Sequence, residues 1–362
     1  MVDIQILHVW LNTIKIGRLA LTPDNLCAFE YDAAWLQSGF SISPFNLPLN
    51  SGVFIAKRTP FNGNFGVFED STPDGWGSYV LDRYIKKSGE DPYKLTALQR
   101  LALIGSTGRG ALEYKPDHSI SAEPDLIDLD RLAVEVDKLL RSAIDDDSVD
   151  LLYQYSGSTG GKVFVDIDGK EWLVKFKAIS DPTDIGQTEY YYSQLAKECG
   201  ILMPETRLFN NKYFGVERFD RTANGKVHTI SAAGLLNADY RIPSLDYGDL
   251  LQVCLVLTKN MEEVIKLFRQ MVFNVLIRNR DDHAKNFSFQ FVNGEWKLSP
   301  AYDLLPSNGF NGFHTTTVNN NGEPSNSDMI ALADKIGINT KIASEIIYEI
   351  KEKIKNAQLK QQ

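Results

Sequence analysis

The feature that most constrains the fold is a long helical stripe of apolar residues that ends abruptly in a polar segment. Between Asn260 and Asn279, apolar side chains recur every three or four residues: Val264, Ile265, Phe268, Met271, Val272, Val275 and Leu276. This period places them on one face of a helix of about five turns, and such a face must pack against a core. The next residues, 278–286, are polar except for one alanine. The sequence therefore predicts a buried helix that leads into a polar loop.

The residues before this helix predict a β-rich part followed by a mixed part. Apolar stretches at 4–11, 14–21 and 26–31 are separated by polar turns, which is typical of a β-meander. Helices are expected after the turn-rich loop 70–77 and around residues 95–104. The polar segment 116–125 holds two prolines and no periodicity, so we place a domain boundary near residue 120.

Beyond that boundary the pattern alternates between strands and helices. A helical stripe at 129–140 precedes the acidic run Asp145-Asp146-Asp147, which we interpret as a solvated loop. A hairpin is expected at 162–176, then a helix at 184–198 and two strands at 206–209 and 213–216. A second hairpin at 287–298 and two terminal helices complete the chain. We therefore predict three domains, at 1–120, 121–217 and 218–362.

Composition excludes several functional classes. The chain carries 38 Lys and Arg against 47 Asp and Glu, a net charge of −9, and no basic run, so direct DNA binding is not expected. No apolar run approaches the ~18 residues that cross a bilayer, and no signal-peptide pattern is present, so we expect a cytoplasmic protein without membrane association. The three scattered cysteines and five histidines lack the spacing of a disulfide framework or a zinc site. We expect buried free thiols, and we expect His283 to order its loop by hydrogen bonding.

Three polar residues near the long helix suit phosphoryl transfer. Asp281 and Asn286 lie five residues apart in the polar loop, and Asp303 follows the second hairpin. Mg²⁺ prefers oxygen ligands, and phosphoryl transfer depends mostly on positioning and charge neutralisation. Kinases carry a catalytic Asp and an Asn at this spacing, with a metal-binding Asp downstream. Because the short pattern also occurs by chance, the interpretation depends on the segments upstream.

Three upstream segments stand in the order that a kinase requires. Residues 156–162, Ser-Gly-Ser-Thr-Gly-Gly-Lys, offer backbone N–H groups to an anion without forming a Walker sequence. Lys175 ends a predicted strand, and Glu189 on the next helix could fix it for phosphate binding. Residues 216–221 join the strand-rich and helical parts, where a bilobal kinase binds adenine through its backbone. Taken singly, each segment would be a plain loop or strand, but their order favours a nucleotide site.

Several long motifs resemble one family. Asn279 to Ser288, N-R-D-D-H-A-K-N-F-S, resembles the N-x-D-x-H-x-K-N-F-S loop of HipA-type serine/threonine kinases, the toxins of bacterial HipBA toxin–antitoxin systems. Residues 298–305, L-S-P-A-Y-D-L-L, are similar to the family's metal-binding P-x-Y-D-x-L segment. Residues 70–77, 105–112 and 216–221 (V-E-R-F-D-R) also resemble family segments. The resemblance implies an α+β, bilobal protein-kinase-like fold with an N-terminal β-rich accessory module and a mainly helical C-terminal lobe.

The resemblance also implies a role for each matching residue. Asp281 would be the catalytic aspartate that orients and deprotonates the acceptor hydroxyl, and Asn286 and Asp303 would hold Mg²⁺ beneath the phosphates of ATP. The residues implied to bind ATP are Ser156, Gly157, Ser158 and Thr159 in the phosphate loop, Lys175 with Glu189 as its ion-pair partner, Glu217 and Phe219 at the hinge, and Lys285. Ser156 and Ser158 are also the implied autophosphorylation sites, and in the family this event ejects the loop and silences the enzyme.

The partners of the family set the functional expectation. Family members phosphorylate aminoacyl-tRNA synthetases and pair with a HipB-like helix-turn-helix antitoxin, so the chain would be a growth-inhibiting toxin that meets DNA only through its antitoxin. Two alternatives stay open: a small-molecule or lipid kinase, whose D-x-H-x-x-N loops look alike, and a catalytically silent corepressor. The phosphate loop lacks the Gln-x-Lys pattern of some family members, so either serine could be the acceptor.

Overall fold

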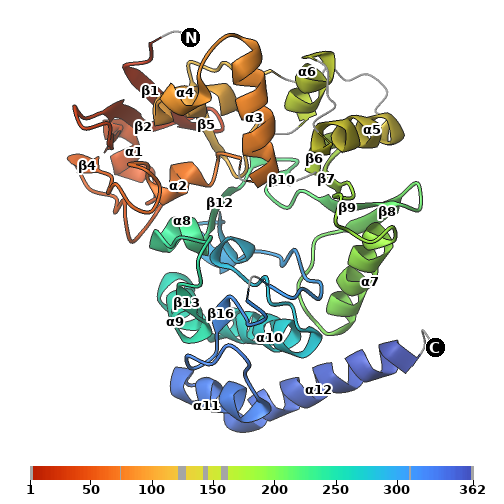
Figure 1. Ribbon diagram of the computed structural model, residues 1–362. Helices are drawn as coiled ribbons and strands as arrows, with labels where there is room; N and C mark the ends of the chain where they lie inside the picture. Colours follow the sequence, from red (N-terminus) through yellow and green to blue (C-terminus); the bar gives the residue numbers. More distant parts are fainter. Residues whose placement is uncertain are drawn as a thin grey trace. The chain divides into compact units, whose positions relative to one another are not determined.

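The chain forms two compact units. The computed structural model describes residues 3–73, 75–120, 128–141, 146–155, 162–309 and 311–359 (Figure 1). The first unit comprises Met1–Gln187, Thr206–Ile230 and Gly234–Asn237, and the second comprises Thr188–Glu205, Ser231–Ala233 and Ala238–Gln362. The chain therefore passes between the units more than once, and the division into three domains stays a prediction.

The N-terminal part of the first unit contains a five-stranded antiparallel sheet of order β4-β3-β2-β1-β5. Its strands are β1 (Ile6–Leu11), β2 (Ile14–Leu21), β3 (Cys27–Tyr31), β4 (Val53–Ile55) and β5 (Leu112–Lys115). The helices of this part are α1 (Ala33–Ser38), α2 (Gly66–Glu69), α3 (Gly75–Lys87), the short 3₁₀ helix η1 (Pro92–Lys94) and α4 (Ala97–Ile104). Alternate strand residues such as Leu7, Val9 and Leu19 are fully buried, so the predicted meander is confirmed.

A second antiparallel sheet in the same unit has the order β6-β7-β9-β8. Its strands are β6 (Lys162–Ile167), β7 (Lys170–Lys175), β8 (Thr206–Phe209) and β9 (Tyr213–Glu217), and the helices α5 (Leu129–Leu140) and α6 (Asp146–Tyr155) belong to the same unit. Helix α7 (Ile185–Glu198) begins in this unit and belongs to the second unit from Thr188 onward. Trp172 and Val174 pack in one buried cluster with Leu132 and Leu139 of α5. The predicted hairpin, helices and strands of this region are all present.

The acidic run departs from its prediction. Asp146 and Asp147 belong to helix α6, although the sequence predicted a loop there. The reason is tertiary: Val149 and Leu152 of this helix are buried, and the Tyr153 ring stacks on Tyr84 of α3 with centroids 4.1 Å apart. Packing of this apolar side stabilises a helix that the polar start of the segment does not predict.

After β9, short elements return the chain to the N-terminal sheet. These are β10 (Arg221–Thr222), β11 (Gly225–Lys226), β12 (His228–Ser231) and α8 (Ala232–Leu236). At the turn between β1 and β2, Asn12 Nδ2 donates to the Lys226 carbonyl at 3.1 Å, and the Lys226 N–H donates to Asn12 Oδ1 at 2.9 Å. The Asn12 side-chain amide thus donates to and accepts from the backbone of a residue 214 positions away.

The second unit is mainly helical. Its helices are α9 (Tyr247–Thr258), α10 (Met261–Ile277), the 3₁₀ helix η2 (Ala284–Asn286), α11 (Asn326–Ile336) and α12 (Thr340–Leu359), and its strands are β13 (Leu245–Asp246), β14 (Ser288–Val292), β15 (Glu295–Leu298) and β16 (Thr316–Thr317). Strands β14 and β15 form the predicted second hairpin, and β13 pairs with β16 in parallel. Among the helices that the structure describes, none is long and apolar enough to cross a membrane.

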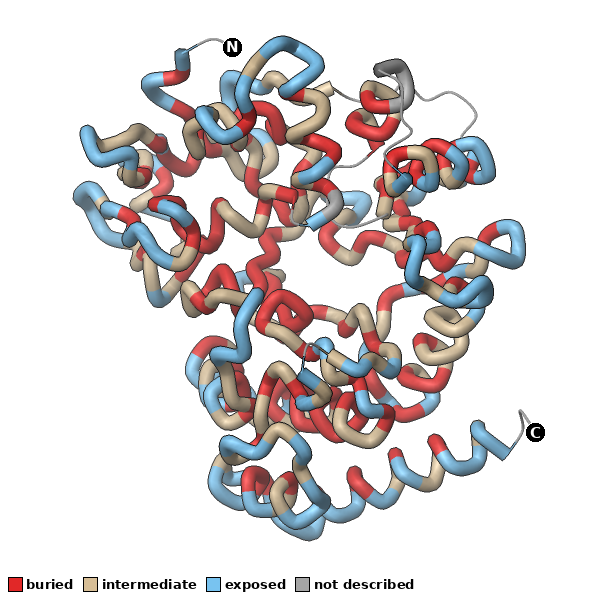
Figure 2. The backbone as a smooth tube through the Cα atoms, in the orientation of Figure 1, coloured by how far each residue is buried: buried red, intermediate tan, exposed pale blue. Residues whose placement is uncertain are grey.

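Helix α10 is the predicted buried helix, but its buried surface is wider than the apolar stripe (Figure 2). Val264, Phe268 and Met271 are fully buried, as expected. Val275 and Leu276 are only half-buried, whereas the polar residues Glu263, Gln270 and Asn274 are buried. Burial of these polar side chains requires hydrogen-bond partners. The three cysteines are buried and free, as the sequence predicted.

One histidine ties strand β12 to the N-terminal part of the first unit. The His228 side chain is 2% exposed, and its Nε2 donates a 2.8 Å hydrogen bond to the Ile42 carbonyl. Burial lowers the pKa of His228 to about 4, although the bond to Ile42 opposes this shift. The imidazole is therefore neutral in the folded chain at neutral pH.

We predict that His228 makes the first unit less stable in mild acid. Its folded pKa of about 4 lies below the unfolded value of 6.5, so only the unfolded chain binds the proton between these values. The stability present above pH 6.5 should fall by about 2 kcal/mol between pH 7 and pH 5. Urea denaturation at both values, compared with His228→Gln, measures this share. An equal pH dependence in the two proteins would contradict it.

Candidate active site

Helix α10 ends in a motif that turns the chain sharply into the polar loop. Arg278 takes a left-handed conformation with φ of 57°, its N–H donates to the Val275 carbonyl, and the Asn279 N–H donates to the Asn274 carbonyl at 2.8 Å. These two bonds are those of a Schellman motif, in which glycine usually occupies the left-handed position. The helix therefore ends at Ile277, and Asn279 is buried directly after it.

The loop that follows is closed by its own side chains. Asn286 Nδ2 donates to the Asp281 carbonyl at 2.7 Å, so the two candidate residues bridge the loop. His283 Nδ1 accepts from the Lys285 N–H at 3.2 Å and begins the short helix η2. His283 thus orders the loop by hydrogen bonding, as the sequence predicted. Asp281 is exposed, whereas Asn286 is buried.

The segment that carries Asp303 is bonded to this loop at two points. Asn279 Nδ2 donates to the Asp303 carbonyl at 3.1 Å, and the Tyr302 hydroxyl donates to the Lys285 carbonyl at 2.6 Å. Asp303 itself has a φ of 55°, a left-handed conformation that non-glycine residues seldom adopt. The structure therefore brings the backbones around Asp281, Asn286 and Asp303 into one bonded set.

A fully buried carboxylate anchors the whole arrangement. Asp282 is 0% exposed and accepts bonds from the Tyr247 hydroxyl at 2.9 Å and from the backbone N–H groups of Thr315 and Thr316 at 2.9 and 3.2 Å. His314 Nδ1 also lies 2.9 Å from its Oδ2. These partners fix the loop to helix α9 and to the segment that contains strand β16.

The anchor continues through α10 to the Asp303 segment. Asn274 Nδ2 donates to the Tyr247 hydroxyl at 3.0 Å, and Asn279 Nδ2 donates to Asn274 Oδ1 at 3.0 Å as well as to the Asp303 carbonyl. Burial raises the pKa of Tyr247 well above its usual value, and the neighbouring Asp282 adds to the effect. The phenol therefore stays protonated and donates to Asp282. We call Asp282, Tyr247, Asn274 and Asn279 the anchor network.

Lys285 is a buried cation beside an aromatic ring. It is 7% exposed, and its Nζ lies 4.5 Å from the centroid of the Tyr240 ring. A cation over a ring face is attracted by the quadrupole of the ring. The Tyr240 ring is also close to His283, with centroids 5.7 Å apart. This aromatic contact fixes the side chain of Lys285 within the loop.

The remaining candidate residues lie elsewhere in the chain. Lys175 ends β7 in the first unit, is half-buried, and has its Nζ 5.6 Å from the Phe214 ring centroid. Glu217 ends β9 in the same unit and accepts from Lys170 Nζ at 2.7 Å, and Phe219 follows it. Glu189 belongs to the second unit, on α7. Ser156, Gly157, Ser158 and Thr159 lie outside the described residues. The ATP-binding roles of all these residues stay predictions.

Family models match most of the chain. The HipA N-terminal domain matches residues 7–115, and the HipA-like C-terminal domain matches residues 152–358. The chain belongs to the HipA family. The predicted resemblance is thereby confirmed over both parts of the sequence.

Individual relatives agree with this assignment. A Sinorhizobium fredii protein named "Putative kinase Y4dM" is 24% identical over 84% of this chain and 78% of its own length. A second protein of that organism, "Putative kinase Y4mE", is 25% identical over 83% of this chain and 77% of its own length. A chain in the solved complex of HipA, HipB and operator DNA from Shewanella oneidensis covers 97% of this HipA-family chain at 19% identity, with 89% of that chain covered and a TM-score of 0.71. This likeness confirms the predicted α+β fold class.

The donor set around this HipA-family loop suits magnesium better than zinc. Asn286 donates through Nδ2 to Asp281, which leaves its Oδ1 as the acceptor end of the amide. Among the residues that the structure describes, no three His, Cys, Asp or Glu side chains form a group that could hold a metal ion. Mg²⁺ keeps several waters and needs few protein oxygens besides substrate phosphates. Asn286 and Asp303 carry oxygen donors of this kind, and their role as metal ligands stays a prediction.

Sequence reasoning missed the residues that support this HipA-family loop. From the sequence, Asp282 is one of two adjacent loop carboxylates, and nothing indicates that it is buried. Tyr247 and His314 lie 35 and 32 residues away from it in the chain, so no local pattern connects them with the loop. Asn274 lies outside the apolar stripe of α10, so only the structure shows that the helix buries it. A polar residue on a buried helical face indicates a hydrogen-bond network.

We predict that Tyr247→Phe destabilises the second unit by about 2 kcal/mol, because it leaves two buried polar partners, Asp282 and Asn274, each without one bond. The matched control is Tyr348→Phe, which removes the same atom from a side chain on α12 that is 67% exposed. Urea denaturation should show little change for this control. Equal stability of the two variants would contradict the role of the anchor network.

Proposed function

We propose that this HipA-family chain is an ATP- and Mg²⁺-dependent serine/threonine protein kinase that acts in the cytoplasm as a growth-inhibiting toxin. One observation carries the proposal. The loop that contains Asp281 and Asn286 is bonded to the Asp303 segment through Asn279 and Tyr302, at 3.1 and 2.6 Å. A catalytic aspartate and two oxygen ligands of a metal require such a fixed spacing. The kinase names of the relatives support the same reaction.

The proposed mechanism assigns the proton to Asp281. Its carboxylate is exposed at the start of the loop, so it can accept a hydrogen bond from a serine or threonine hydroxyl of a protein. It would orient the hydroxyl oxygen toward the γ-phosphorus of ATP and take its proton as the new oxygen–phosphorus bond forms, while the bond between the γ-phosphorus and the bridging oxygen breaks and ADP leaves with that electron pair. Asn286 and Asp303 would hold Mg²⁺, which neutralises the charge of the phosphates when it is bound. The buried Lys285, which belongs to the same loop, supplies a further positive charge.

Nucleotide binding is proposed for residues on other segments. Ser156, Gly157, Ser158 and Thr159 would surround the phosphates, and Lys175 would contact them with Glu189 as its ion-pair partner. Glu217 and Phe219 would bind adenine. Because the Glu217 carboxylate is already paired with Lys170 at 2.7 Å, its contact with adenine would involve the backbone. Lys175 Nζ lies 5.6 Å from the centroid of the Phe214 ring, and an ammonium group at this strand end suits a phosphate contact.

The substrate, regulation and partner are proposed from the family. The target would be a protein, by resemblance an aminoacyl-tRNA synthetase, and Ser156 or Ser158 would accept a phosphoryl group from the chain itself. A phosphate of about −1.5 to −2 charge in that loop would repel ATP, so modification would inhibit the enzyme. The solved relative contains HipB and operator DNA. We extend to this chain a HipB-like antitoxin as its partner, with DNA contacted only through that antitoxin.

We predict that Asp281→Ala lowers phosphoryl transfer about a thousandfold, because the acceptor hydroxyl loses its base. The measurement is transfer from labelled ATP with Mg²⁺ to proteins of a bacterial extract. The control is Asp334→Ala, an exposed aspartate on α11 in the same unit, which should keep full activity. Transfer that survives Asp281→Ala would contradict the proposed mechanism. Labelling of small molecules alone would indicate a metabolite kinase, and ATP binding without transfer would indicate a silent corepressor.

We predict that incubation with ATP and Mg²⁺ adds one phosphoryl group within residues 150–162, because the proposed acceptor serines belong to the segment that would surround the γ-phosphate. Intact mass before and after phosphatase treatment, with peptide mapping, measures this addition. Ser156→Ala and Ser158→Ala, prepared separately, identify the acceptor, and Asp281→Ala is the inactive control. A phosphoryl group that remains in both serine variants would place the modification elsewhere.

A further inference from the structure

Burial alternates along the proposed adenine-binding segment. Arg218 and Asp220 are buried, at 7% and 5% exposure, whereas Glu217 and Phe219 between them are only half-buried. The residues proposed to contact adenine thus alternate with residues that are buried in the protein. Whatever fixes Arg218 and Asp220 also fixes the backbone of Glu217 and Phe219, since they are covalent neighbours.

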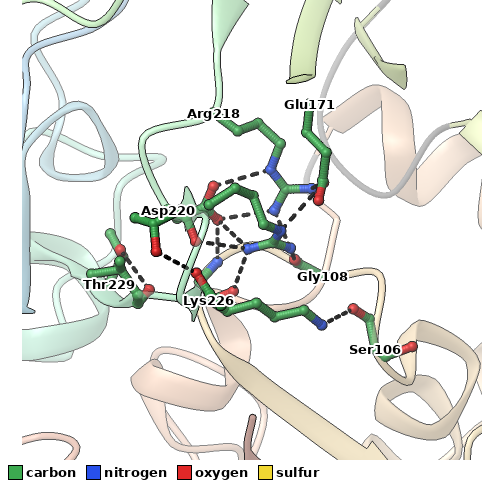
Figure 3. Close-up of polar contacts among 12 residues, drawn as sticks. Ser106, Gly108, Glu171, Arg218, Asp220, Lys226 and Thr229 are labelled. Atoms are coloured by element: carbon green, nitrogen blue, oxygen red, sulfur yellow. Dashed lines mark hydrogen bonds and ion pairs between the residues drawn. The ribbon is translucent and has the colours of Figure 1, made fainter. Parts of the chain in front are cut away.

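Asp220 is the centre of a compact ionic cluster (Figure 3). Its carboxylate accepts from Arg218 Nε and Nη2 at 3.0 and 2.9 Å and lies 3.1 Å from Arg221 Nη1. It also accepts from the Gly110 N–H at 2.7 Å. Glu171 on β7 completes the cluster, because its Oε2 accepts from both Arg218 and Arg221 at 3.2 Å. Two positive and two negative side chains are therefore balanced.

The two arginines extend this cluster to a loop of the N-terminal module. Arg218 Nη2 and Arg221 Nη2 both donate to the Gly108 carbonyl, at 3.0 and 2.9 Å, and Arg221 Nη1 donates to the Gly110 carbonyl at 2.8 Å. Together with the Gly110 N–H on Asp220, these bonds hold the loop entirely through its backbone. Residues 108–110 fall within the match to the HipA N-terminal domain.

A neighbouring contact reinforces the same junction. Lys226 Nζ donates to the Ser106 carbonyl at 2.6 Å and pairs with Glu113 at 2.6 Å. Its backbone bonds to Asn12 attach the same strand to the turn between β1 and β2. The segment that follows β9 is therefore bonded to five residues of the N-terminal module: Asn12, Ser106, Gly108, Gly110 and Glu113.

Stability alone is a weak reason for such a cluster. Burying charges costs desolvation free energy, and buried ion pairs are often no more stabilising than well-packed apolar residues. The planar guanidinium groups of the two arginines do, however, form directional bonds, and these specify one geometry. Burial by itself would raise the pKa of Asp220, but the charges of Arg218 and Arg221 hold it below its usual value. The Asp220 carboxylate therefore stays ionised and keeps accepting from both arginines.

We infer that Asp220, Arg218 and Arg221 are positioning residues for nucleotide binding. They hold residues 217–221 against the backbone of Gly108–Gly110, so that Glu217 and Phe219 present a fixed surface to adenine. The inference rests on the proposed function, because it assumes that this segment binds ATP. It makes the N-terminal module a necessary part of the nucleotide site, although none of its side chains need touch the nucleotide.

Two substitutions in the full-length chain test the cluster in different ways: one removes a charge, and the other shifts the loop that the cluster holds. Asp220→Asn removes the central charge but keeps the shape of the side chain. Gly110→Ala leaves every charge in place, but Gly110 has a φ of 77° and an added Cβ would lie 3.1 Å from the Thr229 carbonyl oxygen, so the loop must shift. The matched control is Asp82→Asn, which breaks the ion pair of Asp82 with Arg100 at 3.1 Å on helices α3 and α4. Thermal melts establish that each variant is folded.

The readouts are the Kd for Mg-ATP by calorimetry and the split between KM and kcat. We expect both cluster variants to raise Kd and KM for ATP about tenfold, with kcat at saturating ATP unchanged, because the displaced hinge weakens binding without touching Asp281. The control should keep the wild-type Kd whatever its loss of Tm. If Asp220→Asn does not fold, Gly110→Ala decides alone.

Three results would overturn the inference. A lower Tm with an unchanged Kd in the folded cluster variants would make the cluster purely structural. An equal rise in Kd for Asp82→Asn would show that general loosening, not positioning, controls affinity. Absence of Mg-ATP binding by the wild-type chain would refute the proposed function itself and the positioning role with it, and this outcome is distinguishable because it needs no variant.

Discussion

The candidate active site depends on one buried carboxylate, Asp282. A charge with no exposure to water is tolerated only when every lone pair finds a donor, and Asp282 finds its donors on two separate segments, helix α9 and residues 314–316. To satisfy it, helix α9, the polar loop and the chain around Thr315 must meet at one point. The bonds through Tyr247, Asn274 and Asn279 then extend the same constraint to the carbonyl of Asp303. The geometry of the exposed Asp281 follows from that of its buried neighbour.

The first unit repeats this arrangement with different residues. Asp220 is also a buried carboxylate next to residues with a proposed chemical role, and it also joins a distant donor, the Gly110 N–H, to its neighbour Arg218. In both places the family motif interleaves two kinds of residue. Asp281 and Phe219 face outward, at least in part, whereas Asp282 and Asp220 face the interior. The length of these two motifs therefore has a physical reason: each contains a residue with a proposed reactive or contacting role together with the buried residue that holds it.

Much of the fold could be predicted because local periodicity and turn chemistry dominate it. Strands β1 to β3, the hairpin across Asp168 and Gly169, and helix α10 lie where alternation or a three-to-four repeat predicts them. Helix α6 could not be predicted, because its stability comes from stacking of Tyr153 on Tyr84 and not from its acidic start. The wide burial of α10 was hidden for a similar reason, since Asn274 is acceptable in the interior only after Tyr247 and Asn279 become its partners.

The sequence by itself determined the order of secondary structure, the HipA family and the identities of Asp281, Asn286 and Asp303 as candidates, because spacing and residue type are local properties of the chain. Only the tertiary structure decided which polar residues are buried and what they hold. The partners of Asp282 and Asp220 lie up to 35 and 110 residues away, and no local pattern specifies which donor a buried carboxylate will meet. Such pairs form because an unsatisfied buried charge is too costly, and that requirement acts only once the chain has folded.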